Sequence, residues 1–167
     1  MLTTHSLNTL HNEMQEAMLA LWQQANHRLN TNFPAPKLLL NQRGAIAGSA
    51  HLQKNLVKLN PHLLRHNKAE FVQQVLPHEL AHLLVFQIHG NTKPHGIEWR
   101  NMMTDVFACR PAVRHNLDTS VLPSKSFRYE CQCGPINLSK IRHNRVLTGQ
   151  QQYRCKQCSE LLQYSPA

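Results

Sequence analysis

The sequence predicts an α+β protein, with helices packed on a small, about three-stranded sheet over residues 1–122 and a small cysteine-rich β segment over residues 123–167. Residues 6–30 carry apolar side chains at helical spacing. The stretch 37–60 breaks into short apolar runs separated by turn residues, which is typical of short strands. Four cysteines in two close pairs mark the last part, and the pattern changes near residues 120–126.

The first helix is expected over residues 6–30, because its apolar side chains fall on one stripe. The stripe consists of Leu7, Leu10, Met14, Met18, Leu21 and Trp22. The segment "NFPAP" at 32–36 ends this helix, since proline cannot continue the backbone hydrogen bonding. Three short strands are expected next, at 37–42, 44–52 and 55–60.

The following helix begins after Asn60, a capping residue followed by proline. A longer helix is expected from about residue 68 to residue 89, ending at Gly90. Residues 97–107 again show apolar side chains at helical spacing, and residues 109–126 form an irregular linker. The helix 68–89 carries the clearest chemical signal in the chain.

Composition and charge limit the environment and the partners. The formal net charge is +9 over 167 residues, which favours acidic partners, nucleic acid above all. No stretch approaches the roughly 20 apolar residues of a membrane helix, and the N-terminal residues lack the pattern of a signal peptide. We therefore expect a cytoplasmic protein without membrane contact, and a monomer by default.

Two histidines and a glutamate interrupt the apolar run "VLPHELAHLLV" at residues 75–85. A helix places His78 and His82 on one face, about 6 Å apart along its axis, where both imidazoles can bind one Zn²⁺. Glu79 is rotated by about 100° from His78. That position does not suit sharing the metal, but it suits a general base that takes a proton from a metal-activated water.

The apolar flanks strengthen the metal interpretation. Leu80 and Leu84 point away from the histidines, and a helix that is apolar on both faces is buried. Buried histidine and glutamate side chains need partners, because an unpaired buried polar group costs several kcal/mol. A metal supplies that partner. The alternative is two core histidines bonded to backbone carbonyls, beside a separately paired Glu79.

Pro77 precedes the first of these histidines and removes one hydrogen bond from a helix. The helix either begins at Pro77 or bends there. Because residues 70–76 are also helical in pattern, we expect a bend just before the site.

A catalytic zinc site has three protein ligands and one open position. His89 lies on the same helical face as His82, but about 10 Å further along the axis, which is too far for both to bind one metal. His95 follows the turn at Gly90 in the loop "NTKPHG", which can fold back over the helix. We therefore expect His95 as the third ligand, with Glu98 as the alternative.

Cys131-x-Cys133 and Cys155-x-x-Cys158 form two cysteine pairs separated by 21 residues. Two such turns joined by a β-hairpin make a closed, tetrahedral zinc ribbon, whose zinc is structural and holds a segment too small to have its own core. The first pair has one spacer residue, where two are usual. The alternatives are a redox pair, or His143 in place of one cysteine.

The ribbon segment also concentrates positive charge. Residues 125–167 contain seven lysines and arginines against two glutamates, with tyrosines between them. Cations beside aromatic rings are typical of surfaces that bind single-stranded nucleic acid, and a solvated basic hairpin is the alternative. The residues expected to contact DNA are Lys140, Arg142, Arg145, Arg154 and Lys156.

Together, "VLPHELAHLLV", "KPHGIEW", "RGAIAGSAHL" and the terminal "YECQC", "RHNRV" and "YRCKQC" resemble the SprT family of zinc metalloproteases over essentially the whole chain. The resemblance implies a zincin-like domain over 1–122, with the active-site helix at its centre, and a Cys₄ zinc ribbon over 123–167. It also implies that His78, His82 and His95 ligate zinc, with Glu79 as the general base. Eukaryotic members of the family cleave proteins crosslinked to DNA.

The sequence therefore predicts a zinc-dependent metallopeptidase of the HExxH type, an endopeptidase with one catalytic and one structural Zn²⁺. Its substrates are proteins or peptides, DNA-associated proteins among them. The alternative is a non-catalytic nucleic-acid-binding protein with two structural zinc sites. A third interpretation, a zinc amidase for a small substrate, requires a narrow enclosed pocket. Glu79 separates these classes, because a structural zinc site has no need for a carboxylate there.

Overall fold

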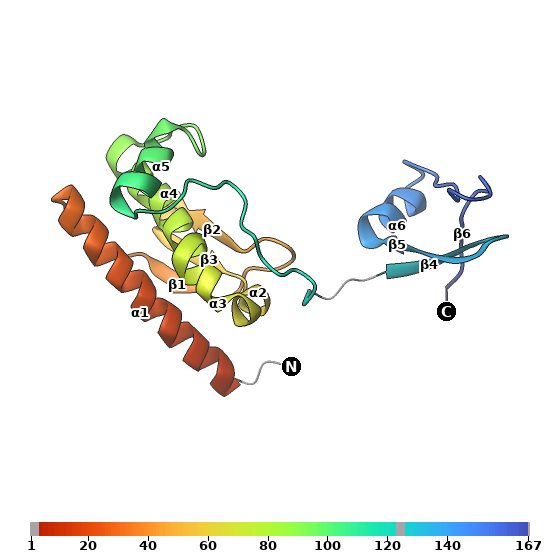
Figure 1. The fold of residues 1–167 in the computed structure, drawn as a ribbon, viewed down its shortest axis with the longest axis horizontal. Helices are drawn as coiled ribbons and strands as arrows, with labels where there is room; N and C mark the ends of the chain where they lie inside the picture. The colour runs from red at the N-terminus through yellow and green to blue at the C-terminus, as the bar shows by residue number, and fades with distance from the viewer. Residues whose placement is uncertain (1–3, 123–125, 167) are drawn as a thin grey trace. The chain divides into compact units, whose positions relative to one another are not determined.

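The computed structural model of the chain describes residues 4–122 and 126–166. The protein is an α+β structure, as predicted, and forms two compact units, Met1–Leu122 and Pro123–Ala167 (Figure 1). None of the helices in the described residues is long and apolar enough to cross a bilayer.

The first unit is built from helices around a small sheet. Its α-helices are α1 (Thr4–Leu29), α2 (Pro61–His66), α3 (Lys68–Glu70), α4 (Leu76–His89) and α5 (Ile97–Asn101). The stripe predicted on α1 supplies Met14, Met18 and Trp22 to the core, each at most 2% exposed. Asn60 caps α2, because its side chain accepts hydrogen bonds from the amides of the first turn.

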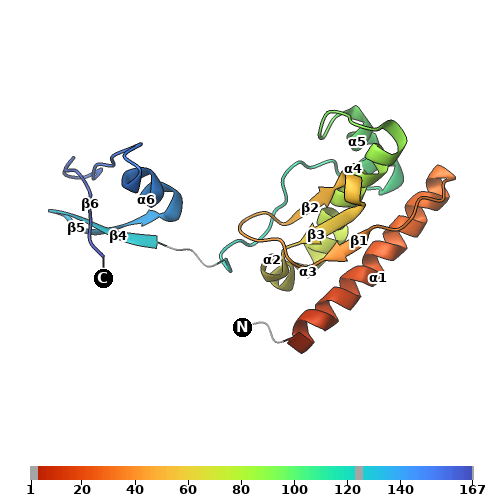
Figure 2. The ribbon, with the colours of Figure 1, turned by 180° about the vertical axis from the view of Figure 1, so that it is seen from behind.

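The sheet of the first unit has the strand order β1-β3-β2. Its strands, β1 (Lys37–Leu39), β2 (Gly48–His51) and β3 (Leu56–Leu59), are shorter than the predicted runs. The central strand β3 pairs parallel with β1 and antiparallel with β2. The helix α4 covers one face of this sheet, as both views show (Figures 1 and 2), and it contacts β2. The strand order makes β2 an edge strand.

The predicted long helix over 68–89 is present. A bend was predicted just before the site, and the structure has a π turn at that position. The turn spans Phe71–Val75, and the amide of Leu76 bonds to the carbonyl of Phe71. Pro77 then lies in the first turn of α4, where its missing N–H is tolerated. Because Pro77 has no N–H, it cannot donate a helical hydrogen bond to the carbonyl of Gln73. That carbonyl accepts a hydrogen bond from the thiol of Cys109 at 3.2 Å.

The second unit contains an antiparallel sheet of β4 (Ser126–Cys131), β5 (Gly134–Ser139) and β6 (Gln163–Tyr164), in the order β5-β4-β6. A β-hairpin was predicted to join the two cysteine pairs. This prediction is wrong in one part, because the segment between the pairs contains a helix, α6 (Lys140–Leu147). Ser139 caps α6 by accepting from the amide of Arg142, and half of the residues of α6, namely Lys140, Arg142, Arg145 and Leu147, are good helix formers.

Candidate metalloenzyme site and cysteine cluster

Three histidine side chains converge beside α4. The Nε2 atom of His95 lies 3.0 Å from Nε2 of His78 and 3.1 Å from Nε2 of His82. A tetrahedral zinc ion with Zn–N bonds of about 2.0–2.1 Å holds its ligand nitrogens about 3.3 Å apart. The three nitrogens therefore fit one Zn²⁺, and three protein ligands leave a fourth position for water or substrate.

A buried tryptophan fixes the orientation of these rings. Trp99 of α5 is 1% exposed, and its ring centroid lies 4.7 Å from those of His78 and His95 and 5.6 Å from that of His82. Its Nε1 donates a hydrogen bond to the carbonyl of His78 at 3.2 Å. Trp99 belongs to the stretch 97–107, which was predicted only as a helix with apolar side chains, whereas in the structure its ring supports all three histidine rings.

His95 reaches the site because the chain turns back sharply after α4. Its φ is 55°, in the left-handed region that costs non-glycine residues roughly 1–2 kcal/mol and recurs at functional positions. The amide of Gly96 donates to the carbonyl of Lys93 at 2.9 Å, and Nε of Arg100 donates to the carbonyl of His95 at 3.3 Å. A Cβ on Gly96 would lie 2.9 Å from the oxygen of Lys93, so the turn requires glycine.

The environment keeps the three imidazoles neutral. Burial, reinforced by the neighbouring histidines, lowers the pKa of His78 to about 3 and that of His82 to about 4. Burial and then the charge of Arg100 lower the pKa of His95. The carbonyl of Ala112 faces the His78 ring and opposes its shift. Metals bind the neutral form of imidazole, so the rings are ready to act as ligands at neutral pH.

Glu79 lies next to these histidines, on the side of α4 that faces β2. Its side chain is buried, and burial raises its pKa to about 7, partly counteracted by a hydrogen bond from the backbone of Ala50. A carboxyl group whose pKa lies near neutral pH can both accept a proton and return it. The environment of Glu79 therefore suits a group that exchanges protons near neutral pH.

Gly48, the first residue of β2, leaves the space that Glu79 occupies. A Cβ on Gly48 would lie 3.1 Å from both Cγ and Oε1 of Glu79, and 3.1 Å from Cδ2 of Leu59. These separations are shorter than ordinary carbon contacts, so a larger residue would displace its neighbours. No local sequence pattern indicates this contact, because the two residues meet only through the packing of α4 on β2.

A fourth histidine, His115, also faces the site. One donor atom each from His78, Glu79 and His115 lie within 4.8 Å of one another. His115 lies in the stretch that was predicted as an irregular linker, and no role was predicted for it. Glu98, the alternative third ligand, belongs to neither of the histidine groups found among the described residues.

The four cysteines come together in the second unit. One sulfur each from Cys131, Cys133, Cys155 and Cys158 lies within 4.8 Å of the others. A tetrahedral zinc ion with Zn–S bonds of about 2.3 Å places its sulfurs about 3.8 Å apart. The cluster is therefore compatible with a zinc ribbon. The short C-x-C spacing of the first pair still allows its two sulfurs to lie close to those of the second pair.

Backbone amides favour the thiolate that a metal requires at one of these positions. The amides of Cys158 and Gln157 lower the pKa of Cys155 to about 6, and the amide of Gln157 donates to Sγ of Cys155 at 3.4 Å. The alternative ligand His143 lies outside the cluster. It is buried instead against Tyr129, whose hydroxyl is 3.1 Å from its Nδ1.

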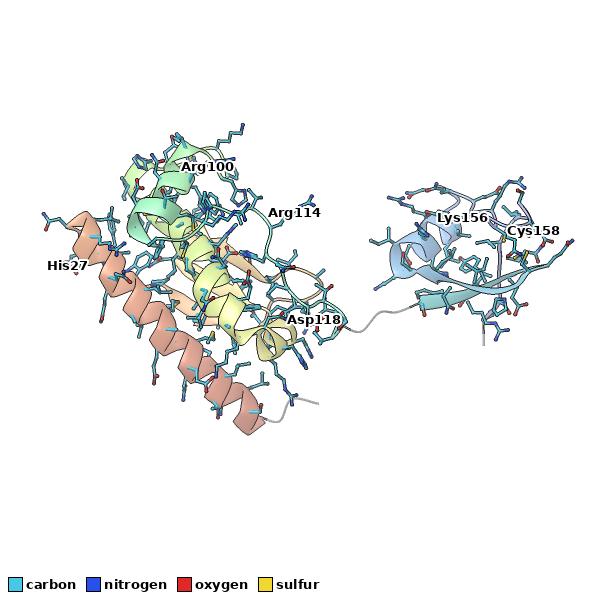
Figure 3. All side chains as sticks on the ribbon, viewed as in Figure 1. His27, Arg100, Arg114, Asp118, Lys156 and Cys158 are labelled. Atoms are coloured by element: carbon cyan, nitrogen blue, oxygen red, sulfur yellow. The ribbon has the colours of Figure 1, made fainter. Side chains whose placement is uncertain are left out.

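Three of the five predicted DNA contacts surround one hollow of about 390 Å³ on the second unit (Figure 3 labels Lys156). The polar side chains that line it are those of Arg142, Tyr153, Arg154, Lys156 and Gln157, over an apolar floor. The guanidinium of Arg142 lies 5.6 Å from the ring centroid of Tyr153. Lys140 and Arg145 are exposed on α6 but do not line this hollow.

A family model and several curated relatives match this chain and show the family to which it belongs. The model of the SprT-like family matches residues 18–120, which include α4 and all three convergent histidines. The chain belongs to the SprT-like family. A curated relative named Protein SprT from Shewanella oneidensis is 47% identical over 137 residues, covering 82% of this chain and 88% of its own length.

Other SprT relatives match similar lengths of the chain. Protein SprT of Yersinia pestis is 47% identical over 142 residues, or 85% of this chain and 84% of that protein. Protein SprT of Pasteurella multocida is 43% identical over 152 residues, or 91% of this chain and 92% of that protein. All three matches are longer than the 122 residues of the first unit, so each includes residues of the cysteine-rich unit. No solved structure matches the chain.

Proposed function

We propose that this SprT-like protein is a zinc-dependent endopeptidase with a zincin-like domain, and that Glu79 is its general base. The observation that carries the proposal is a buried carboxyl group with a pKa near neutrality, one residue from the first of three histidines whose nitrogens converge on one point. A zinc site that only stabilises the fold has four protein ligands and no need for such a carboxyl group.

Each residue of the site has a distinct task in this proposal. His78, His82 and His95 hold the zinc through their Nε2 atoms. Zinc, when bound, supplies Lewis acidity, which lowers the pKa of water toward about 7 and polarises a carbonyl group. Glu79 accepts the proton of the attacking water and later donates it to the nitrogen of the leaving amine. Trp99 keeps the rings in place, so that the reacting groups stay aligned.

The edge strand β2 supports an extended protein substrate. It ends the sheet order β1-β3-β2 and contacts Glu79 through Gly48 and Ala50. An edge strand has unpaired backbone groups along one side, and an extended peptide can add to them as a further strand. Such pairing would lead a peptide bond in the middle of a chain past Glu79, as an endopeptidase requires.

The hollow on the second unit supports DNA-associated proteins as substrates. Arg142, Arg154 and Lys156 offer cations to phosphates, and Tyr153 with the apolar floor offers a surface for an unstacked base. This combination favours single-stranded DNA. A non-catalytic protein with two structural zinc sites could use the same hollow, but it would leave Glu79 without a role.

Removal of the histidine-bound zinc tests the proposal. The wild-type protein should bind two Zn²⁺ per chain, cleave an unstructured protein such as casein, lose cleavage on chelation and regain it with zinc. His95→Ala should keep only the zinc of the cysteine cluster and lose cleavage. The matched control His89→Ala, at an exposed position on the last turn of α4, should keep both. A fully zinc-loaded wild-type protein that cleaves nothing, with or without single-stranded DNA, would support the non-catalytic alternative.

A further inference from the structure

His115 faces the catalytic site without belonging to any element that the mechanism above uses. It lies in the irregular segment 107–122, which follows α5 and a second π turn at Met102–Val106, and its ring centroid is 4.9 Å from that of His78. A nitrogen of His115 lies within 4.8 Å of donor atoms of both His78 and Glu79. His115 is therefore placed on the side of the ligands where the general base lies.

The segment that carries His115 is fastened on both sides of it. Before His115, the thiol of Cys109 donates to the carbonyl of Gln73 at 3.2 Å. After it, Asn67 donates to the carbonyl of Asp118 at 3.1 Å and accepts from the amide of Asp118 at 2.8 Å (Figure 3 labels Asp118). Both partners belong to the helical region before α4, so the segment is anchored on each side of His115.

One ring nitrogen of His115 is left without a partner. Its Nδ1 is buried and has no hydrogen bond to any of the described residues. Buried polar atoms in folded proteins almost always have partners, and each exception needs an explanation, such as a catalytic role or a bound water or ion. A neutral imidazole also carries one N–H, so His115 always has a donor to offer.

We propose that His115 is a further catalytic residue, which donates a hydrogen bond to the oxygen of the scissile carbonyl as negative charge develops on that oxygen. The inference rests on the proposed peptidase function. The N–H of His115 would stabilise the negative charge on the carbonyl oxygen in addition to the Lewis acidity that zinc supplies when bound. Donors held in this way at a developing oxyanion contribute among the largest effects in enzyme catalysis.

The electron and proton movements balance without any further reactant. The oxygen of water bonds to the carbonyl carbon while Glu79 takes the water proton, and the π pair of the carbonyl moves to its oxygen. His115 shares its N–H with that oxygen and keeps the proton. When the C–N bond breaks, the oxygen pair re-forms the carbonyl, and the nitrogen leaves with the C–N pair and the proton from Glu79.

Two substitutions separate hydrogen-bond donation from packing and from metal binding. His115→Phe keeps a ring of similar shape without a donor, and His115→Gln keeps an N–H donor. His62→Phe, an exposed histidine on α2, is the matched control. For each zinc-loaded protein, we would measure kcat and KM on a peptide substrate, the zinc content, and the Kd of a phosphinic peptide, whose tetrahedral anionic phosphorus resembles the reacting carbon.

For His115→Phe, kcat should fall about 100- to 1000-fold, and the Kd of the phosphinic peptide should rise about 100-fold. KM should stay within about 3-fold, because the hydrogen bond forms in the transition state. The zinc content should not change. His115→Gln should recover at least about 10-fold of the loss in kcat. His62→Phe should match the wild type in every measurement.

Unchanged kcat and phosphinic-peptide affinity in His115→Phe would overturn the proposal, and so would the loss of one zinc, which would make His115 a ligand. If His115→Phe does not fold, His115→Leu serves as the variant without a donor. If the wild-type protein cleaves nothing, the proposed function fails by itself. The phosphinic-peptide Kd then still decides whether His115 binds a tetrahedral anion.

Discussion

In the metal-free protein, replacing Glu79 with glutamine should increase stability above neutral pH. Burial raises the pKa of Glu79 from 4.5 to about 7, so the folded protein keeps a proton there over a pH range where the unfolded chain has lost it. Folding is thereby linked to proton uptake. The stability linked to this carboxyl group is fully present below pH 4.5 and is lost as the pH rises to about 7. Glutamine has no such proton to lose.

The magnitude follows from the two pKa values of Glu79. At 1.36 kcal/mol per pKa unit, a rise from 4.5 to about 7 makes Glu79→Gln more stable than the wild type by about 3 kcal/mol at pH 8 and by about 1 kcal/mol at pH 5. With zinc bound, the charge of the metal favours the carboxylate, so the gain should shrink.

Urea unfolding followed by tryptophan fluorescence measures this difference, because Trp22 and Trp99, the two tryptophans of the chain, both lie in the first unit. The proteins are first treated with chelator and then compared at pH 5 and pH 8. Glu16→Gln, at an exposed position on α1, is the control and should change stability by less than about 0.5 kcal/mol at either pH. Equal stability of Glu79→Gln and wild type at pH 8, or the same gain at both pH values, would refute the reasoning.

Two other substitutions test the geometry of the two units. Gly48→Ala should displace Glu79 and lower kcat about 10- to 100-fold with the zinc content unchanged. The control Ser49→Ala, on the opposite face of β2, should have little effect. Equal activities of the two variants would show that the contact between Gly48 and Glu79 is unimportant. Cys155→Ser should lower zinc binding from two ions to one and unfold the second unit in NMR spectra while the first unit stays folded. Two zinc ions bound to Cys155→Ser would instead show that the cysteine cluster does not hold the second zinc.

The parts of the fold and site that follow from local spacing were predictable. The 3.6-residue period identified the long helix over 68–89, and the four-residue spacing of His78 and His82 placed both rings on one face of it. His95 was predicted from the turn after the helix, which brings it back beside them. Such features depend on neighbours in the chain, which the sequence displays directly.

The parts that depend on contacts between distant segments were not predictable. Gly48 meets Glu79 only because α4 packs on β2, and His115 faces His78 only because the segment 107–122 folds back along α4. The helix α6 was missed because the short basic run lacks an apolar stripe, although Ser139 gave a capping signal for it.

The most direct test of the central claim compares cleavage of an unstructured protein by the zinc-loaded wild type and Glu79→Gln, with the zinc content determined on the same samples. Both proteins should hold two Zn²⁺ per chain. Only the wild type should cleave efficiently, and the variant should lose about 100- to 10,000-fold in rate, as expected for removal of a general base. Full activity of Glu79→Gln at the same zinc content would contradict the account.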